Sequence, residues 1–259
     1  MAERVVSAVH GRREIMADPD FEVGLAASLR ASHDLPRLLD LYARFAAGEG
    51  EFDTMMRRVI WRAACRRFGH GVSVGAGAGF KHLETFEIGS GVFIGAQAYI
   101  QGRFDGTCRI GDHVWIGPQA YMDARNLVLE DYVGWGPGAK VLGSEHTGSP
   151  GDVPIIQTDL RIEPVVVKRG ADIGTGAVLL PGVTVGEGAI VGAGAVVTAD
   201  VPDFAIAAGV PARVLRYRKE DDLPPLTPRR MEGGNKEDDL PPLTPRRMEG
   251  GNREDLNAR

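Results

Sequence analysis

An aliphatic residue recurs at every sixth position in the later part of the chain, and this period restricts the fold more than any other feature. Between residues 167 and 197 the series consists of Val167, Ile173, Leu179, Val185, Val191 and Val197. A period of six fits neither an α-helix of 3.6 residues per turn nor the alternation of a lone hairpin. It fits short strands joined by tight corners, where glycine adopts the required backbone conformation without a Cβ clash. Glycine is abundant, with 35 among 259 residues.

The same hexad phase begins earlier in the chain and returns after each interruption. Its earlier members are Ile88, Ile94, Ile100, Ile110, Ile116, Met122, Leu129, Trp135 and Val141. When three strands close one turn, such residues point inward and stack on their equivalents in the next turn. We therefore predict a mainly β fold, a parallel β-helix of hexapeptide repeats over residues 69–217. The step from 141 to 167 is too long for a corner, so residues 147–164 are expected to project as a loop.

Residues 1–68 contain few glycines and show helical spacing. Apolar residues at steps of three and four predict helices over residues 35–48 and 51–69, as an N-terminal helical cap. The second segment also carries arginines at positions Arg57, Arg58, Arg62, Arg66 and Arg67. We favour a solvated helix face for these arginines over a binding patch for an anionic ligand.

Residues 218–259 form a polar tail with a tandem duplication. The 17-residue segment KEDDLPPLTPRRMEGGN occupies residues 219–235 and recurs at 236–252. Mixed charges, paired prolines and few apolar residues predict that this tail is disordered. A polyproline segment that binds a partner is the alternative.

Charge and composition exclude several functional classes. The formal net charge of −5 gives no reason to expect a nucleic-acid partner. No run approaches the roughly 18 apolar residues of a membrane span, and the N-terminus lacks the apolar core of a signal peptide. Two cysteines, Cys65 and Cys108, cannot build a disulfide framework and are expected to be packing residues. These features predict a cytoplasmic protein without a membrane span.

Residues 70–217 resemble the hexapeptide-repeat acyltransferases, and are similar to the maltose, galactoside and nodulation O-acetyltransferases. The most specific part is the segment RIEPVVVKRGADIGTGAVLLPGVTVGEGAIVGAGAVVTADVPDFAIAAGVPARVLRYR. The resemblance implies the left-handed form of the β-helix and a homotrimer with active sites between subunits. It also implies acetyl-CoA as the cosubstrate, whose acyl group passes to a hydroxyl or amine, and no metal.

His146 matches the catalytic histidine of this family. It lies in GSEHTG, where the repeat gives way to the long insertion. An acceptor hydroxyl is a poor nucleophile until a base removes its proton, and imidazole exchanges protons near neutral pH. The resemblance therefore implies that His146 is the general base; a surface loop histidine is the alternative. Backbone N–H groups near the loop would stabilise the oxyanion.

The resemblance also implies contacts with coenzyme A. Thr175 in IGTGAV, Ala193 in VGAGAV and Thr198 in VVTADVP would line a groove for the cofactor. Arg213 and Arg216 in GVPARVLRYR would meet its phosphates.

Four positions depart from the family pattern. Asp172 replaces a common Trp and Ala199 a common Lys, while Gly117 and Arg125 replace the Asn and Asp that hold the sugar in galactoside-type enzymes. Because these sugar-holding residues differ, the resemblance does not imply the acceptor of the galactoside-type enzymes for this chain. Local candidates for acceptor contact are Asp123, Arg125, Trp135, Glu145 and Tyr121.

The sequence predicts an acetyl-CoA O-acetyltransferase that acts on a sugar, a glycan or a small hydroxyl compound. N-acetylation of an amino sugar is the alternative reaction. A non-catalytic hexapeptide-repeat protein that binds a ligand or acts as a scaffold is an alternative from another class. A metal-dependent lyase would need a histidine cluster, but His82, His113 and His146 lie 31 and 33 residues apart.

Overall fold

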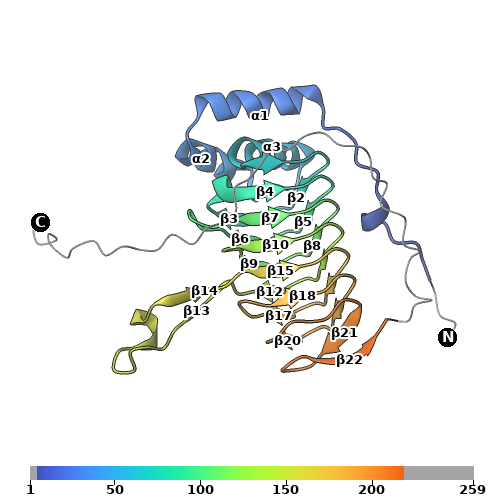
Figure 1. Ribbon diagram of the computed structural model, residues 1–259. Coiled ribbons are helices and arrows are strands. Elements are labelled where there is room, and N and C mark those ends of the chain that lie inside the picture. The colour runs from blue at the N-terminus through green and yellow to red at the C-terminus, as the bar shows by residue number, and fades with distance from the viewer. Residues whose placement is uncertain (1–4, 219–259) are drawn as a thin grey trace, which may run out of the picture. The chain divides into compact units, whose positions relative to one another are not determined.

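A computed structural model describes residues 5–218 of the chain, which form stacked turns of short parallel strands with helices at one end (Figure 1). Sheet A contains β1 (Arg67–Phe68), β4 (Phe86–Ile88), β7 (Cys108–Ile110), β10 (Leu127–Leu129), β15 (Val165–Val167) and β18 (Thr184–Val185). Sheet B contains β2 (Ser73–Val74), β5 (Phe93–Ile94), β8 (Trp115–Ile116), β11 (Gly134–Trp135), β16 (Asp172–Ile173), β19 (Ile190–Val191), β21 (Ala205–Ala208) and β22 (Arg213–Tyr217). Sheet C contains β3 (Gly79–Lys81), β6 (Tyr99–Gln101), β9 (Tyr121–Asp123), β12 (Lys140–Val141), β17 (Val178–Leu179) and β20 (Val196–Val197).

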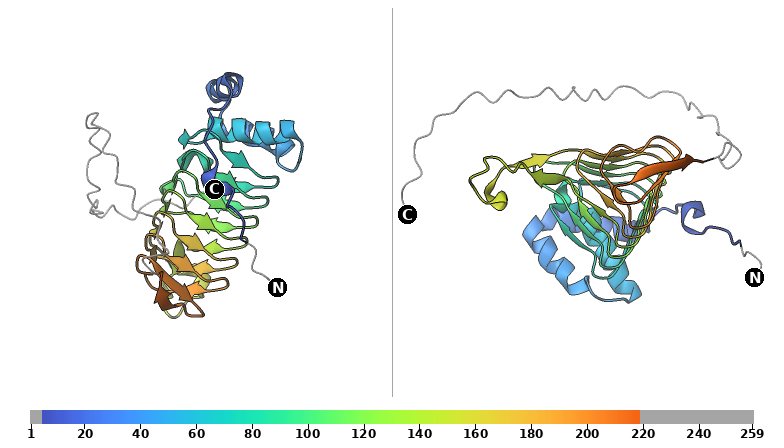
Figure 2. Two further views of the ribbon diagram at one scale, coloured as in Figure 1. Left: turned by 90° about the vertical axis from the view of Figure 1, so that its right-hand side faces the viewer. Right: turned by 90° about the horizontal axis from the view of Figure 1, so that it is seen from below.

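Each of the first six turns takes one strand from each sheet, and strands of successive turns pair in parallel register. The seventh turn adds β21 to sheet B, and β22 pairs with it antiparallel. On sheet A the inward column runs through Ile88, Ile110, Leu129, Val167 and Val185, all at most 3% exposed. These are the hexad positions, so the structure confirms the predicted mainly β fold and its inward-facing residues. The turns superpose when the prism is viewed from below (Figure 2).

The three sheets meet at three edges, named here A–B, B–C and C–A after the sheets they join. One residue per turn at the B–C edge has a positive φ, and the column consists of Gly77, Gln97, Gln119, Gly138, Gly176 and Gly194. Each amide in this column from Gln97 onward donates to a carbonyl on the preceding turn, at 2.9 Å in every case. The B–C edge is therefore a continuous line of left-handed residues along the prism.

Three helices cover the first turn, one more than the two predicted segments. They are α1 (Asp20–Ser32), α2 (Leu35–Phe45) and α3 (Glu51–Ala64), preceded by the short 3-10 helix η1 (His10–Arg12). Asp34 caps α2 by accepting a hydrogen bond from the backbone of Arg37. The α3 helix buries Ile60 and Trp61 completely, so its apolar stripe closes the open end of the core.

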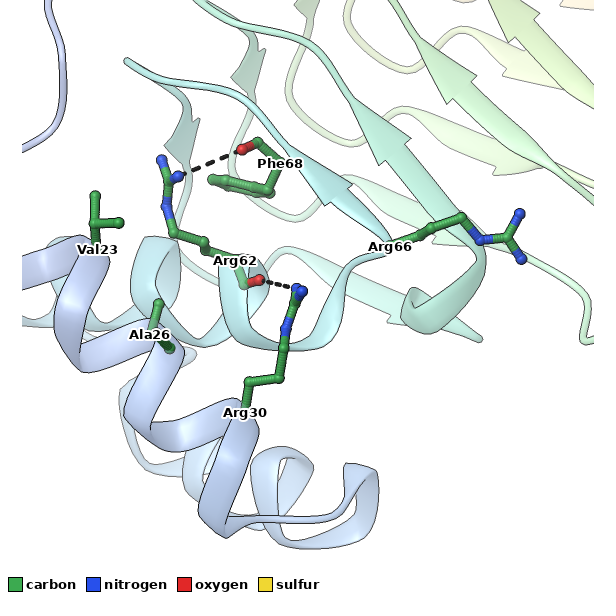
Figure 3. A pocket seen from close by; sticks show the side chains of 7 residues that line it. Val23, Ala26, Arg30, Arg62, Arg66 and Phe68 are labelled. Carbon is green, nitrogen blue, oxygen red and sulfur yellow. Dashed lines mark hydrogen bonds between the residues drawn. The ribbon is translucent and has the colours of Figure 1, made fainter. Parts of the chain in front are cut away.

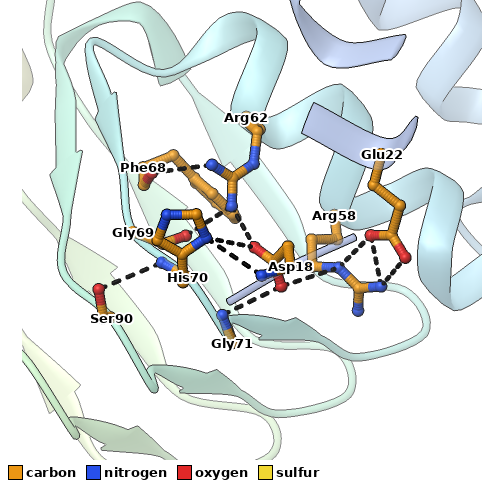
Figure 4. A network of polar contacts seen from close by, with 9 residues as sticks. All are labelled: Asp18, Glu22, Arg58, Arg62, Phe68, Gly69, His70, Gly71 and Ser90. Atoms are coloured by element: carbon orange, nitrogen blue, oxygen red, sulfur yellow. Dashed lines mark hydrogen bonds and ion pairs between the residues drawn. The ribbon is translucent and has the colours of Figure 1, made fainter. Parts of the chain in front are cut away.

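The predicted solvated face on α3 is wrong for three of its arginines. Arg57 is 2% exposed, and its Nε donates to the carbonyl of Val74 at 2.9 Å, which ties the helix to the first turn. Arg58 makes a bidentate contact with Glu22 of α1, and Arg62 pairs with Asp18 (Figure 4). A helical pattern cannot reveal such partners, because they come from segments distant in sequence.

Asp18 joins the N-terminal segment to the first turn. Its Oδ1 accepts from the amide of Gly71 at 3.1 Å, and its own amide donates to Nδ1 of His70 at 3.2 Å (Figure 4). The predicted tail lies outside the described residues except for Arg218. No helix among residues 5–218 combines the length and apolar character needed to cross a membrane.

Val167→Ala should lower the free energy of unfolding by about 2 kcal/mol, because it removes two methyl groups from the filled core. Val166→Ala is the matched control, since the neighbouring Val166 points out of sheet A and is only partly buried. We expect a change below about 0.5 kcal/mol for this control. Chemical denaturation of the two variants would measure both values, and equal losses would contradict the assigned inward phase.

Candidate active site

An arm leaves the prism at the C–A edge, directly after β12 of the fourth turn. Its base is a two-stranded antiparallel sheet of β13 (Ser144–His146) and β14 (Leu160–Ile162), and the short 3-10 helix η3 (Ile155–Gln157) lies between them. Figure 1 shows this arm extending away from the stacked sheets. The predicted projection of residues 147–164 falls within this arm.

The arm holds His146 in a defined orientation. Nδ1 of His146 lies 3.0 Å from the backbone oxygen of Thr158, in hydrogen-bonding geometry. A carbonyl oxygen can only accept, so Nδ1 must carry the proton, and Nε2 then keeps its lone pair. This is the arrangement that a general base requires.

Thr158 is itself fixed, which makes it a firm support. It is 6% exposed, and its Oγ1 donates to the carbonyl of Ile155 at 2.7 Å and accepts from the amide of Gly148 at 3.2 Å. This role could not be predicted from the sequence, because a backbone oxygen has no residue-type signature.

Two of the predicted acceptor residues meet at the root of the arm. The Oδ1 of Asp123 lies 2.9 Å from Nε of Arg125, and Oδ2 accepts from Oγ of Ser144 at 3.1 Å. Both charged side chains are at least 85% buried. Glu145 lies further out and pairs with Arg161 across the arm at 3.1 Å.

Trp135 does not fit its predicted role as an acceptor contact. Its side chain is fully buried inside the prism, where the indole Nε1 donates to the carbonyl of Ala139 at 3.2 Å. The cause is its hexad phase, which points position 135 inward. Tyr121 lies on the outer face of sheet C instead, stacked on Tyr99 with ring centroids 6.1 Å apart.

Gly117 is explained by the packing of the turns. A Cβ at this position would lie 2.6 Å from the backbone nitrogen of Pro137 on the next turn. The backbone there leaves no room for a side chain, so the Asn contact of galactoside-type enzymes has no counterpart at this position.

The positions matched to coenzyme A contacts form two groups. Thr175 and Ala193 lie on neighbouring turns at the B–C edge, where the amide of Gly194 donates to the carbonyl of Thr175 at 2.9 Å. Thr198 follows β20 and lies toward the C–A edge. Arg213 and Arg216 are exposed on β22, which pairs antiparallel with β21 of the last turn.

The B–C edge offers open space for an extended chain. A Cβ built at Gly138, Gly176 or Gly194 would meet no atom within 4 Å. Bare backbone over three consecutive turns suits the pantetheine arm of coenzyme A, because no side chain blocks its approach to the peptide groups. The open space along this edge therefore fits the cofactor that the resemblance implies.

Asp172 begins β16 and lies exposed on the outer face of sheet B. Its Oδ1 would be 2.2 Å from a Cβ placed on Gly134, so the carboxyl group lies against the sheet over that glycine. Partial desolvation by this contact raises the pKa of Asp172 above its ordinary value. The ionised form is therefore less favourable here than in water.

A cluster of arginines near the helical cap has a structural explanation. A pocket of about 260 Å³ between α1 and α3 is lined by Arg30, Arg62 and Arg66 (Figure 3). Arg30 donates to the carbonyls of Arg62, Ala63 and Cys65, so it caps the end of α3. Within residues 5–218, no three His, Cys, Asp or Glu side chains gather as a metal site.

The two cysteines are buried and free. Burial raises the pKa of the Cys108 thiol to about 12, and the pKa of Cys65 well above its ordinary value. A buried thiol in its neutral form is a poor nucleophile, so neither residue suits an acyl-carrying role.

The parallel prism and the oriented histidine on its arm define a protein of the hexapeptide-repeat class. No family model matches the chain. It is 38% identical over 142 residues to nodulation protein L of Rhizobium meliloti (strain 1021), an alignment that covers 54% of this chain and 68% of that protein. The chain therefore belongs to the hexapeptide-repeat acyltransferase family and is an acyltransferase.

Shorter alignments and a solved structure agree with this family. The chain is 37% identical over 59 residues to galactoside O-acetyltransferase of Escherichia coli (strain K12), covering 23% of this chain and 29% of that enzyme. It is 40% identical over 52 residues to a dTDP-3-amino-3,6-dideoxy-α-D-galactopyranose 3-N-acetyltransferase of Aneurinibacillus thermoaerophilus, covering 20% and 27%. These two alignments span less than a third of each relative.

A hexapeptide-repeat acetyltransferase of Vibrio cholerae O1 biovar eltor, solved with acetyl coenzyme A, shares the fold. It matches with a TM-score of 0.52 at 24% identity, over 78% of this chain and 91% of that one.

Asp172→Asn should raise the melting temperature at pH 7, because it removes a carboxylate that folding desolvates. The pKa of Asp172 is higher in the folded protein than in the unfolded chain, where it is about 3.9. The free energy of unfolding therefore decreases as the pH rises above about 3.9. The advantage of the variant should therefore shrink as the pH falls below about 4. Thermal unfolding at pH 7 and pH 3.5 would test this, with the exposed Asp152→Asn on the arm as control. A lower melting temperature for Asp172→Asn at pH 7 would contradict the argument.

Proposed function

We propose that the protein is an acetyl-CoA-dependent O-acetyltransferase acting on a sugar, a glycan or a small hydroxyl compound. The hydrogen bond from Nδ1 of His146 to the carbonyl of Thr158 carries this proposal, because it leaves Nε2 available as a base. Family membership supports acetyl transfer, and the similarity to galactoside O-acetyltransferase supports a hydroxyl acceptor.

His146 moves one proton in each half of the reaction. Its Nε2 accepts the proton of the acceptor hydroxyl as that oxygen attacks the acetyl carbonyl carbon. The resulting imidazolium then gives this proton to the sulfur as the carbon–sulfur bond breaks. Thr158 keeps the ring oriented throughout, since its carbonyl stabilises the Nδ1 proton that the imidazolium retains.

Acetyl-CoA supplies the acetyl group as an activated thioester when it is bound. Thr175 and Ala193 would support its extended arm through their backbone groups at the B–C edge. Arg213 and Arg216 would pair with its phosphates, since both guanidinium groups are exposed at the far end of the prism. Thr198 would contribute from the side of the C–A edge.

The acceptor would lie at the root of the arm. Glu145 directly precedes His146, while Asp123 and Arg125 lie on the preceding turn, where Asp123 accepts a hydrogen bond from Ser144 at the base of the arm. A carboxylate accepts hydrogen bonds from hydroxyls and a guanidinium group donates hydrogen bonds to them, so the two together suit a sugar.

N-acetylation of an amino sugar is the second candidate reaction. The similarity to an N-acetyltransferase of a dTDP-amino sugar favours it. His146 could remove a proton from an amine as well as from a hydroxyl, so a direct comparison of acceptors decides between the two. A non-catalytic binding protein would instead show no acceptor-dependent thiol release.

The positions of the two groups support a homotrimer with active sites between subunits. His146 extends from the C–A edge, whereas Thr175 and Ala193 lie at the B–C edge. A side of six residues separates these edges, up to about 20 Å in an extended chain. The histidine of one subunit would therefore act on the acetyl group bound along the B–C edge of a neighbour.

The exposed apolar residues of the arm support this assembly. Ile155 is 60% exposed and Ile156 is 81% exposed. Burial against a neighbouring subunit would remove this apolar area from water. A cytoplasmic location is part of the same proposal, supported by two thiols that remain unpaired.

His146→Ala should lower turnover by roughly 10² or more while acetyl-CoA binding persists, because the base is lost but the groove is not. Thiol release from acetyl-CoA would be measured over a panel of sugars, amino sugars and simple alcohols. The native protein adds little background in this assay, since Cys65 and Cys108 are buried. His33→Ala, at the end of α1, is the matched control. Equal activity of His146→Ala and the wild type would refute the assignment of the base.

The protein should sediment as a trimer, with three times the subunit mass of 27.8 kDa. Ile156→Glu should weaken this assembly, because the charge would have to be buried against the neighbour. Analytical ultracentrifugation of both proteins would check this. A monomeric wild type would exclude shared active sites.

A further inference from the structure

The B–C edge carries glutamine at two turns where the other turns carry glycine. Gln97 and Gln119 have φ values of 58° and 60°, while Gly77, Gly138, Gly176 and Gly194 occupy the same column. A residue with a Cβ is less favourable than glycine in this left-handed conformation. The two side chains are therefore kept at a conformational cost to the fold.

Packing does not account for the amide groups of these two side chains. Other left-handed residues pack on a neighbour, as His113 does on Tyr132, with ring centroids 4.7 Å apart. Gln97 and Gln119 are exposed; the Cγ of Gln97 lies beside Gly77, and the two amides contact one another, from Nε2 of Gln119 to Oε1 of Gln97 at 3.1 Å. Each amide still has hydrogen-bonding capacity toward solvent or a ligand.

The amide pair lies where the bare groove ends. Open backbone extends over the fourth, fifth and sixth turns, and Gln119 on the third turn is the first side chain beyond it. The pantetheine arm has about the backbone length of four residues, roughly 14 Å. Three spacings between turns, of about 4.8 Å each, cover the same length. Arg213, a proposed phosphate contact, lies opposite Ala208 on the seventh turn. A pantetheine arm that starts there and spans three turn spacings would end at the fourth turn, next to Gln119.

We propose that Gln97 and Gln119 bind the acceptor at this end of the groove, facing the arm of the neighbouring subunit with its His146, and that they select an uncharged, polyhydroxylated molecule. This inference rests on the proposed acetyltransferase function. Side-chain amides donate and accept hydrogen bonds without a net charge, as vicinal hydroxyls do. Tyr99 follows Gln97 by two residues and stacks on Tyr121, so an aromatic surface lies beside the amide pair.

Glycine substitutions separate this role from a structural one. Gln97→Gly and Gln119→Gly remove the amides and also relieve the left-handed conformation, so the melting temperature should stay equal or rise. The KM for maltose and for methyl β-D-galactopyranoside should increase about tenfold, the effect of losing one or two hydrogen bonds. The KM for acetyl-CoA should stay within about twofold, because Thr175 and Ala193 are unchanged. Saturation-transfer NMR with maltose should show the same loss of binding in the presence of CoA.

His113→Ala is the matched control, since His113 lies on the third turn in the same left-handed conformation but at the A–B edge. It should leave the KM for both sugars unchanged. An unchanged sugar KM in the glycine variants, with His146→Ala inactive, would overturn the inference and leave the proposed function standing. A lower melting temperature of the glycine variants, or loss of their trimer, would also overturn the inference, because it would assign the amides to folding or assembly. A His146→Ala protein as active as the wild type would remove the proposed function and this inference with it.

Discussion

Parallel backbone hydrogen bonds between successive turns determine the rest of the described structure. Amides donate from turn to turn along the prism, as from Gly117 to Trp135 and from Gly136 to Ile173, both at 2.7 Å. At this spacing a Cβ on Gly136 would lie 2.5 Å from the nitrogen of Thr175. Glycine at such corners is therefore a consequence of the stacking, and the inward direction of each hexad residue is another. The edges on which functional side chains can stand follow from the same ladder.

The repeat made the fold predictable, because one periodic signal specifies strand length, corner position and the inward face together. The repeat also predicts a buried Trp135, since the hexad phase places this residue in the core and excludes an acceptor contact. The partners of Arg57 and Arg58 were not predictable, because Val74 and Glu22 approach only when the helices pack. Thr158 was hidden for a related reason: it acts through a backbone oxygen set by the geometry of the arm.

The candidate site divides the chemistry between two edges of the prism. In the proposed mechanism the C–A edge supplies proton transfer, through the arm and His146, and the B–C edge supplies the open groove. The proposed assembly would bring the two edges of neighbouring subunits together. The interruption of the glycine column at Gln97 and Gln119 could be found in the sequence by aligning the corners, once the turns are counted. Side chains that depart from a repeat are informative because stacking does not require them.

The arm also changes how the chain must fold. Paired strands on sheet A are usually about 20 residues apart, as Cys108 and Leu127 are, but Leu127 and Val165 pair across twice that separation. Doubling a closing loop costs only about 0.6 kcal/mol of chain entropy. A stack of turns that contact only their neighbours can grow from one nucleus in either direction. Closing the arm is therefore a single delayed step in an otherwise uniform propagation, and inserting the segment that contains His146 lowers the stability of the fold only slightly.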